Sequence, residues 1–204
     1  MSLSCKKIFF GNLVFHVDEN VYESAEDSFL FAENVNIREG STAIDVGTGC
    51  GLLAVIAARR ASLVIGVDIN PYAIRCAIEN AKLNHVESKT FFLQTDLFAA
   101  IKRGSKFDFI FFNAPYLPVV PTQRSSWLER AWVGGGSGRQ VIDRFILESP
   151  DYLKRGGIIL MMQSTLSNVD ETLREFERQG LRARVVAKRD LAFFETIALV
   201  EAKR

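Results

Sequence analysis

The sequence predicts one α/β domain built on a doubly wound, mostly parallel sheet of seven strands. Short apolar runs alternate with stretches of helical periodicity along most of the chain. Two β-rich runs follow each other near the C-terminus, which predicts an antiparallel pair that closes the sheet. The 204 residues, 48% of them hydrophobic, are enough for one domain with a substantial core.

Five apolar runs with polar or glycine boundaries predict parallel strands that are buried on both faces. In chain order these runs are STAIDVG, SLVIGVD, KTFFLQTD, FDFIFFN and GGIILMMQ. The antiparallel pair is predicted from RARVVAK and FETIALVEA. Right-handed crossovers would join the parallel strands, so ligands should bind at the carboxyl ends of those strands.

Four stretches between these runs have apolar residues at helical spacing. One spans Leu52 to Arg60, and a second begins at Pro71, because proline is favoured in the first turn of a helix. The other two are each marked by four apolar side chains on one face, namely Val141, Ile142, Phe145 and Ile146, and then Leu166, Val169, Leu173 and Phe176.

Composition and charge exclude several kinds of protein. Lys and Arg total 25 against 24 Asp and Glu, so the net charge of +1 gives no overall attraction to nucleic acid or to an anionic membrane. The three cysteines and two histidines have no zinc-like spacing, which predicts no metal site and a reduced cytoplasmic compartment. The stretch KKIFFGNLVF has the basic start of a signal sequence, but the charged Asp18 follows too soon after it for such a segment. No apolar run approaches the roughly 20 residues of a membrane span.

Polar side chains follow four successive strands of the predicted sheet. They are, strand by strand, Asp45 with Gly47, Gly49 and Gly51, then Asp68, then Asp96, and then Asn113. Alternate glycines let the backbone turn sharply and approach a ligand, while the next helix presents free N–H groups. Asp68 is placed to accept hydrogen bonds from a ribose diol. The four strand ends therefore predict one pocket, although tight turns also use glycine for structure alone.

The glycine turn favours one class of ligand. A dinucleotide-binding turn reads G-x-G-x-x-G and holds a pyrophosphate, whereas this sequence has G-x-G-x-G preceded by Asp45. An aspartate would repel a pyrophosphate but suits a ligand with an amino group and a sulfonium charge. The turn resembles the first motif, D/E-x-G-x-G-x-G, of the class I S-adenosylmethionine-dependent methyltransferases. That resemblance implies that the glycine loop lies against the methionine part of the cofactor, that Asp68 holds the ribose, and that Asp96 reaches the adenine amino group.

The stretch FFNAPYLP resembles the (N/D)-P-P-Y motif of the methyltransferases in this superfamily that modify a planar nitrogen. The resemblance implies that the Asn113 side-chain oxygen and the Ala114 carbonyl accept hydrogen bonds from that nitrogen, beside the cofactor, and that Tyr116 stacks on the substrate. Such a nitrogen is a poor nucleophile, so stabilising the charge that develops on it would accelerate transfer. Pro115 would set the turn and bias Ala114 toward an extended conformation, which predicts a functional motif. The alternative is an ordinary proline-containing turn that Asn113 begins.

A second stretch narrows the family. VYESAEDSFLFAENV, residues 21–35, closely resembles VYEPAEDTFLL of the HemK-type release-factor glutamine N5-methyltransferases, in their archaeal and eukaryotic branch. AWVGGGSGRQVIDRFI, residues 131–146, is similar to a segment of the same branch. The resemblance implies that residues 1–37 cover the cofactor and substrate site of a core spanning 38–204. It places Tyr22 and Ser28 against the cofactor and Glu23 against the substrate, while Ser24 and Asp27 could instead be a helix-capping pair.

The resemblance implies methyl transfer to the side-chain amide nitrogen of glutamine, in the Gly-Gly-Gln tip of a class I translation release factor. It also implies a small zinc-ribbon activator protein bound along the edge strand KTFFLQ, where Phe91 or Phe92 would need cover. Burial of both rings beneath helices of this chain is the alternative. The long loop 117–137, with Trp127 and Trp132, is predicted to be a mobile substrate-binding lid or a glycine-rich lead into the next helix.

Two other functions are consistent with the same pocket. N6-adenine methylation of DNA or RNA needs the same chemistry, but the chain has no basic excess and no room for a separate target-recognition domain. A methyltransferase-like binding subunit without turnover is the noncatalytic alternative.

Overall fold

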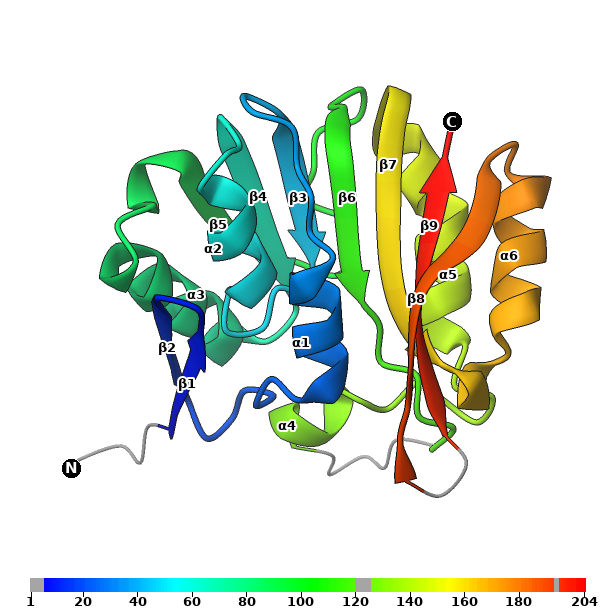
Figure 1. Ribbon diagram of the computed structural model, residues 1–204, viewed down its shortest axis with the longest axis horizontal. Helices are drawn as coiled ribbons and strands as arrows, with labels where there is room; N and C mark the ends of the chain where they lie inside the picture. Colours follow the sequence, from blue (N-terminus) through cyan, green and yellow to red (C-terminus); the bar gives the residue numbers. More distant parts are fainter. Residues whose placement is uncertain (1–5, 120–125, 193–194) are drawn as a thin grey trace.

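The computed structural model describes residues 6–119, 126–192 and 195–204. Its main sheet has seven strands in the order β5-β4-β3-β6-β7-β9-β8, with β9 antiparallel to both of its neighbours and the other pairings parallel (Figure 1). This arrangement confirms the predicted sheet and its C-terminal antiparallel pair. The strands are β3 (Thr42–Val46), β4 (Leu63–Asp68), β5 (Thr90–Gln94), β6 (Phe107–Asn113), β7 (Leu153–Ser164), β8 (Arg182–Asp190) and β9 (Thr196–Lys203).

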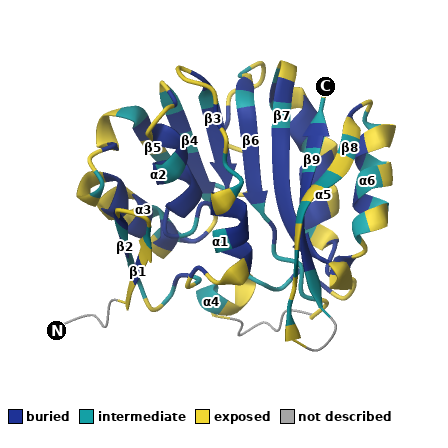
Figure 2. Cartoon of the chain, in the orientation of Figure 1, coloured by how far each residue is buried: buried dark blue, intermediate teal, exposed yellow. Residues whose placement is uncertain are grey.

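Helices cover both faces of this sheet, and each face has its own apolar core. One core packs beneath the first three helices, and the other packs beneath the last two (Figure 1). The central strands are mostly buried, as Figure 2 shows in dark blue, because helices cover both faces of the sheet there. The helices are α1 (Glu26–Glu33), α2 (Leu52–Ala58), α3 (Pro71–Leu83), α4 (Trp127–Arg130), α5 (Gln140–Glu148) and α6 (Val169–Arg178), with short 3-10 turns at Glu87–Lys89, Ser149–Tyr152 and Thr165–Ser167.

The start of α3 shows how local sequence fixes an element beside the carboxyl ends of the strands. The Asn70 side chain accepts a hydrogen bond from the Tyr72 amide at 2.9 Å and so caps the helix. Pro71 follows in the first turn, as the sequence predicts, because its missing N–H would have no helical partner there.

The last predicted helix, α6, differs at its start. Leu166 lies in the preceding 3-10 turn and is 48% exposed, so the helical face begins at Val169.

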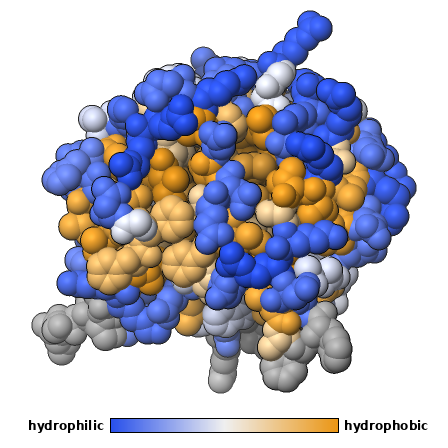
Figure 3. All heavy atoms as spheres, viewed as in Figure 1, coloured by the Kyte–Doolittle hydropathy of each residue, from blue (hydrophilic) through white to orange (hydrophobic). Residues whose placement is uncertain are grey.

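An N-terminal hairpin is one element that the sequence pattern does not predict. Strands β1 (Lys6–Phe10) and β2 (Leu13–Val17) pair antiparallel outside the main sheet. Asn80 of α3 and Asn84, its C-cap residue, hold the hairpin, since they accept the backbone amides of His16 and Val14 at 2.8 and 3.1 Å. Hydrophobic side chains gather over the lower left of Figure 3. The Phe10 ring of the hairpin stacks on Phe29 of α1. The hairpin therefore ties the N-terminus to α1 and α3, which border the pocket described below.

Within the described part of the chain, the helices are all too short or too polar to cross a membrane.

Candidate functional site

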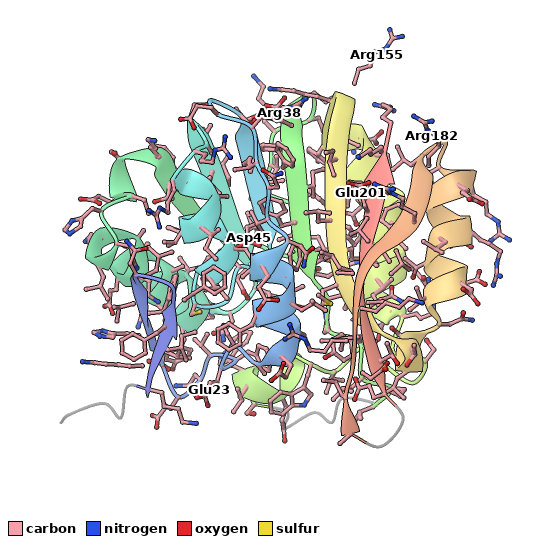
Figure 4. The ribbon with its side chains drawn as sticks, in the orientation of Figure 1. Glu23, Arg38, Asp45, Arg155, Arg182 and Glu201 are labelled. Carbon is pink, nitrogen blue, oxygen red and sulfur yellow. The ribbon has the colours of Figure 1, made fainter. Side chains whose placement is uncertain are left out.

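A cavity of about 720 Å³ opens at the carboxyl ends of β3, β4 and β6, at the edge of the sheet where the sequence predicts a pocket. Most of the predicted site residues line it, namely Tyr22, Ser28, Gly47, Gly49, Asp68, Asp96, Asn113, Ala114, Pro115 and Tyr116. Three do not. Gly51 packs beneath the loop, Asp45 lies behind it, and Glu23 points outward at the rim to pair with Lys6 of the hairpin (Figure 4).

The glycine loop between β3 and α2 forms one wall of the cavity. Gly47, Gly49 and Gly51 all have positive φ, of +66°, +55° and +86°. A Cβ on Gly51 would stand 3.0 Å from the Ala77 Cβ, so this glycine allows α2 and α3 to pack closely. The Asp68 carboxylate at the end of β4 accepts the Gly49 amide at 2.9 Å and thereby fixes the loop against the next strand end.

Asp68 keeps its carboxylate at the wall of the cavity while it holds this backbone. Its second oxygen accepts the Asn70 amide at 2.9 Å. Burial raises the pKa of this carboxyl above its ordinary value, and the two backbone hydrogen bonds oppose the shift. Each carboxylate oxygen retains a lone pair for a ligand, because each can accept more than one hydrogen bond.

Asp45 supports the loop from within the core. Its Oδ2 atom accepts the Thr48 hydroxyl at 2.7 Å and the Ala54 amide at 3.2 Å, while Oδ1 is buried without a hydrogen-bond partner. Burial raises the pKa of this carboxyl to about 7. Asp45 thus orients the loop and the start of α2 rather than standing on the cavity wall (Figure 4).

Replacing Asp45 with asparagine is expected to remove a pH dependence of stability. The raised pKa means that the folded protein binds a proton which the unfolded chain, with an ordinary value of 3.8, releases. Stability from this group is therefore present below pH 3.8 and is lost as pH rises through about 7, by up to about 4 kcal/mol. Asparagine resembles the protonated acid, so Asp45→Asn should gain stability relative to wild type as pH rises from 4 to 8. Urea unfolding of both proteins across this range measures the difference, and a pH-independent difference would contradict the assignment.

Asn113 is the last residue of β6, and hydrogen bonds hold the nitrogen end of its side-chain amide. The Asn113 Nδ2 atom donates to Ser28 Oγ at 3.1 Å and to Asp27 Oδ2 at 3.4 Å. The Asn113 Oδ1 atom is buried and has no hydrogen-bond partner. The next residue, Ala114, donates its amide to the Met162 carbonyl of β7 at 3.2 Å. The strand end thus provides a buried side-chain acceptor on a fixed backbone at the cavity wall.

Asp27 links four side chains around this acceptor, those of Tyr22, Ser28, Asn113 and Tyr116. Besides Asn113, it accepts the hydroxyls of Tyr22 at 3.1 Å and Tyr116 at 3.4 Å. Burial and the neighbouring Asp27 charge raise the pKa of both tyrosines, so both keep their hydroxyl protons at neutral pH. The helix-capping alternative for Ser24 and Asp27 is wrong. The N-cap of α1 is Ala25, which makes no side-chain cap, and Ser24 instead lies 3.6 Å from the Cys50 sulfur.

A glycine-rich turn supports the backbone of Tyr116. The Leu117 amide donates to the Trp132 carbonyl and the Gly134 amide donates to the Leu117 carbonyl, both at 2.9 Å. The backbone of Gly138 packs against that of Tyr116, and a Cβ on Gly138 would stand 2.4 Å from the Tyr116 carbonyl oxygen. In the loop 117–137, residues 120–125 lie outside the described part of the chain. Its described part contains α4, and Trp127 and Trp132 line the cavity.

Replacing Gly138 with alanine is expected to destabilise the protein by about 1–3 kcal/mol more than replacing Gly156 with alanine. The two glycines share a φ of +72°, so both substitutions carry the same backbone strain. A Cβ on Gly156 meets nothing within 4 Å, whereas one on Gly138 collides with Tyr116. Free energies of unfolding in urea measure the difference, and equal losses would show that the Tyr116 contact relaxes without cost.

Two contacts of the site have no clear sequence signal. Arg144 of α5 donates to Asp96 at 2.9 Å, so that the acid after β5 carries an ion pair at the cavity wall. Arg130 lies over the Trp127 ring at 5.1 Å at another part of the wall. Arg144 and Asp96 are 48 positions apart, and Arg130 and Trp127 lie on the four-residue helix α4. Neither arginine follows a strand, so the position of each at the cavity could not be predicted from the strand ends.

Comparison with known proteins finds relatives that are described as methyltransferases. A family model for ribosomal protein L11 methyltransferase (PrmA) matches residues 27–117. A putative protein N5-glutamine methyltransferase from Methanocaldococcus jannaschii is 40% identical over 181 residues, which cover 88% of this chain and 90% of that protein. The Homo sapiens methyltransferase HEMK2 is 30% identical over 204 residues, which cover 95% of this chain and 94% of that protein.

Solved structures share the fold. One is the E. cuniculi Mtq2-Trm112 complex, described as responsible for methylation of the eRF1 translation termination factor. It matches with a TM-score of 0.66 at 23% identity, over 91% of this chain and 99% of that chain. A T. thermophilus 16S rRNA methyltransferase in complex with AdoMet and guanosine matches with a TM-score of 0.73 at 19% identity, over 100% of this chain and 52% of that chain.

Proposed function

The chain belongs to the family of protein N5-glutamine methyltransferases, and from that premise we propose that it methylates the glutamine of a Gly-Gly-Gln tip in a class I translation release factor. The whole chain, residues 1–204, would act as one methyltransferase domain in which residues 1–37 border the site. The description of the Methanocaldococcus jannaschii relative supports this reaction, and the geometry around Asn113 supports this residue as its site.

The observation that carries the proposal is the buried, unpaired Asn113 Oδ1 atom. A buried acceptor without a partner costs free energy, so its retention at a cavity wall favours a ligand that donates to it. A primary amide provides two N–H donors on one planar nitrogen. Asn113 Oδ1 and the Ala114 carbonyl would accept these two donors, and Tyr116 would stack on the amide plane. Pro115 would hold the turn between them.

The residues of the cavity fit S-adenosylmethionine. Gly47 and Gly49 form a turn without side chains, and Gly49 carries no contact within 4 Å of where a Cβ would stand. Asp68 would hold the ribose, and Asp96, already paired with Arg144, would reach the adenine amino group. Tyr22, Ser28 and Asn113 line the same cavity and would border the cofactor. When bound, this cofactor supplies an electrophilic methyl group.

The protein would contribute positioning and charge stabilisation. The amide nitrogen becomes tetrahedral and positively charged as its lone pair attacks a methyl carbon, and the two acceptors would interact more strongly with its N–H groups at that point. Asn113 cannot rotate to follow the substrate because its Nδ2 atom is held by Ser28 and Asp27. The methylated nitrogen is acidic enough to lose its extra proton to water. Positioning of this kind accounts for a large part of the acceleration in bimolecular reactions.

Replacing Ala114 with proline is expected to change the rate of methyl transfer modestly. Only the Ala114 carbonyl is needed by the substrate, and proline keeps it. The substitution removes the Ala114 N–H, however, and with it the hydrogen bond to Met162, which should cost about 1 kcal/mol of stability. Steady-state kinetics and urea unfolding of the same variant separate the two effects. A rise from near inactivity to strong activity would show that alanine had disabled the motif.

Transfer of labelled methyl to a purified archaeal or eukaryotic release factor tests the proposal. The release factor should be labelled when it carries its Gly-Gly-Gln glutamine and unlabelled when that residue is replaced by alanine. Equal labelling of both forms would move the acceptor elsewhere on the factor. Absence of label from both, with the cofactor bound, would contradict the proposed substrate.

The edge strand β5 would bind a small zinc-ribbon activator. Phe91 and Leu93 of this strand are 59% and 41% exposed. The alternative in which helices of this chain bury both Phe91 and Phe92 is therefore wrong for Phe91. Phe92 packs against the core. An edge strand with exposed apolar side chains is a typical site for strand addition by a partner. A relative of this fold, Mtq2, forms a complex with Trm112.

Binding of the candidate activator should be lost in Phe91→Ser and kept in Leu147→Ser. Leu147 is a matched control, because it is 65% exposed and lies on α5, away from β5. Analytical ultracentrifugation of the mixed proteins measures complex formation. Undiminished binding to Phe91→Ser, or a wild-type chain that stays monodisperse and soluble on heating alone, would argue against a partner at this edge.

The nucleic-acid alternative has little support from charge. Among the cavity-lining residues in the described ranges, the cationic side chains are Arg130 and Arg144. Arg144 is paired with Asp96, and Arg130 lies over Trp127. Two arginines with these partners do not make the basic groove that a nucleic-acid backbone requires.

A further inference from the structure

We propose that Asp27 is a positioning residue that fixes which end of the Asn113 amide faces the cavity. The inference rests on the proposed function, in which Asn113 Oδ1 accepts a hydrogen bond from the substrate. It assigns α1 a part in orienting the end of β6, because Asp27 belongs to α1 and Asn113 to β6.

The contacts of Asp27 divide between its two oxygens. The Oδ1 atom accepts the Tyr22 hydroxyl at 3.1 Å, and the amide and hydroxyl of Ser28 at 2.6 and 3.1 Å. The Oδ2 atom faces Asn113 Nδ2 and the Tyr116 hydroxyl, each at 3.4 Å. The residue is only 5% exposed. Five donors therefore converge on one buried carboxylate, and two of them belong to the predicted catalytic motif.

The chemistry of these groups sets the direction of the Asn113 amide. A carboxylate accepts hydrogen bonds and has none to donate, so the NH₂ end of Asn113 must face Asp27. Ser28 reinforces this direction, because its hydroxyl proton is directed to Asp27 and its lone pair is left to accept Asn113 Nδ2 at 3.1 Å. The carbonyl end of Asn113 is thereby turned away from both residues. A flipped Asn113 would set its oxygen against the Asp27 carboxylate and would present donors to a substrate that itself donates.

Stabilisation of the helix end does not explain the position of Asp27. An acid in the first turn of α1 interacts favourably with the helix dipole while exposed to water. Glu26 already occupies that turn, lies on the surface and pairs with Arg189 at 2.7 Å. Burial of a second carboxylate beside it costs free energy unless hydrogen bonds compensate for the lost water. Asp27 obtains these from Tyr22 and Ser28 nearby and from Asn113 and Tyr116 at the cavity wall.

The variant Asp27→Asn tests this role, because it keeps the shape of the side chain and gives it a donor. Asn113 can then flip and direct its oxygen to residue 27, which removes the acceptor from the cavity. We expect kcat for a release factor to fall about 10²-fold, with the Kd for S-adenosylmethionine changed less than about threefold. In the Asn113→Ala background, the same substitution should lower kcat no more than about twofold, because the group it positions is gone.

A matched control is Asp108→Asn. Asp108 also belongs to a hydrogen-bonded carboxylate cluster, accepting Thr42 and Lys154 at 2.8 Å, but it lies at the other end of β6 and does not line the cavity. This variant should lose stability and keep its kcat. Equal kcat losses in Asp27→Asn and Asp108→Asn, or full additivity with Asn113→Ala, would overturn the proposal.

A second readout is independent of turnover. The side-chain ¹⁵N resonance of Asn113, assigned by its loss in Asn113→Ala, should shift when Asp27→Asn reverses its hydrogen bonds, and it should stay in place in Asp108→Asn. An unchanged resonance in Asp27→Asn would sink the positioning role. A wild-type chain that leaves the release factor unlabelled would contradict the proposed function alone, and the resonance would still decide the role of Asp27.

Discussion

Replacing Asn113 with alanine is expected to lower kcat for methyl transfer to a release factor about 10³-fold, the size of effect seen when one preorganised hydrogen-bonding group of a transition state is removed. The variant loses the buried Oδ1 acceptor and leaves the Ala114 carbonyl as the single remaining acceptor for the substrate amide. Affinity for S-adenosylmethionine should change little, since the glycine loop and Asp68 are untouched. Single-turnover kinetics with saturating cofactor measure the chemical step.

Asn34→Ala is the matched control for this substitution. The Asn34 side chain donates to the Leu30 carbonyl at 2.8 Å at the end of α1 and does not line the cavity. It should lose about 1 kcal/mol of stability and keep its rate. If Asn113→Ala retained a rate within tenfold of wild type, the Asn113 oxygen would not be the acceptor on which transfer depends.

Replacing Asp68 with alanine is expected to weaken S-adenosylmethionine binding at least about 10²-fold, because two charge-assisted hydrogen bonds to a ribose contribute about 1.5–3 kcal/mol each. The variant also frees the Gly49 amide, which Asp68 holds at 2.9 Å, so the glycine loop loses its fixed shape. Isothermal titration with the cofactor measures the Kd. The rate at saturating cofactor should fall much less than the affinity.

Asp18→Ala is a control for removing an acid that accepts the amide two residues ahead of it. Asp18 accepts the amide two residues ahead, that of Asn20, at 2.8 Å, as Asp68 accepts that of Asn70 at 2.9 Å. Asp18 does not line the cavity, so its removal should leave the Kd near the wild-type value. Similar Kd changes in the two variants would mean that loss of such a backbone contact alone weakens cofactor binding, which would contradict the ribose contact of Asp68.

The sheet and much of the cavity wall follow from sequence pattern. Buried parallel strands leave a strong signal in runs such as FDFIFFN, and the carboxyl ends of these strands place Asp68, Asp96 and Asn113 around one cavity. Asp45 shows the limit of that reasoning. It lies one residue before the end of β3, and its side chain turns into the core toward Thr48, because adjacent side chains of a strand point to opposite faces.

Long-range polar contacts could not be predicted in this way. The hairpin at residues 6–17 depends on Asn80 and Asn84, which are more than 60 positions away along the chain. The partners of Asp27 at Asn113 and Tyr116 are 86 and 89 positions away, whereas local spacing also allowed a capping pair with Ser24. Local pattern reports which face is apolar, whereas the partner of a buried polar group depends on tertiary packing.

The position of the transferred methyl group decides whether this chain methylates a glutamine amide. A release factor would be incubated with the wild-type chain and the candidate activator, digested and sequenced by tandem mass spectrometry, and part of the product would be hydrolysed in acid. We expect one added methyl on the Gly-Gly-Gln glutamine and release of methylamine on hydrolysis, because the methyl group is on the amide nitrogen. A methyl group that remains on a lysine or arginine after hydrolysis, or on no residue of the factor, would contradict glutamine methylation.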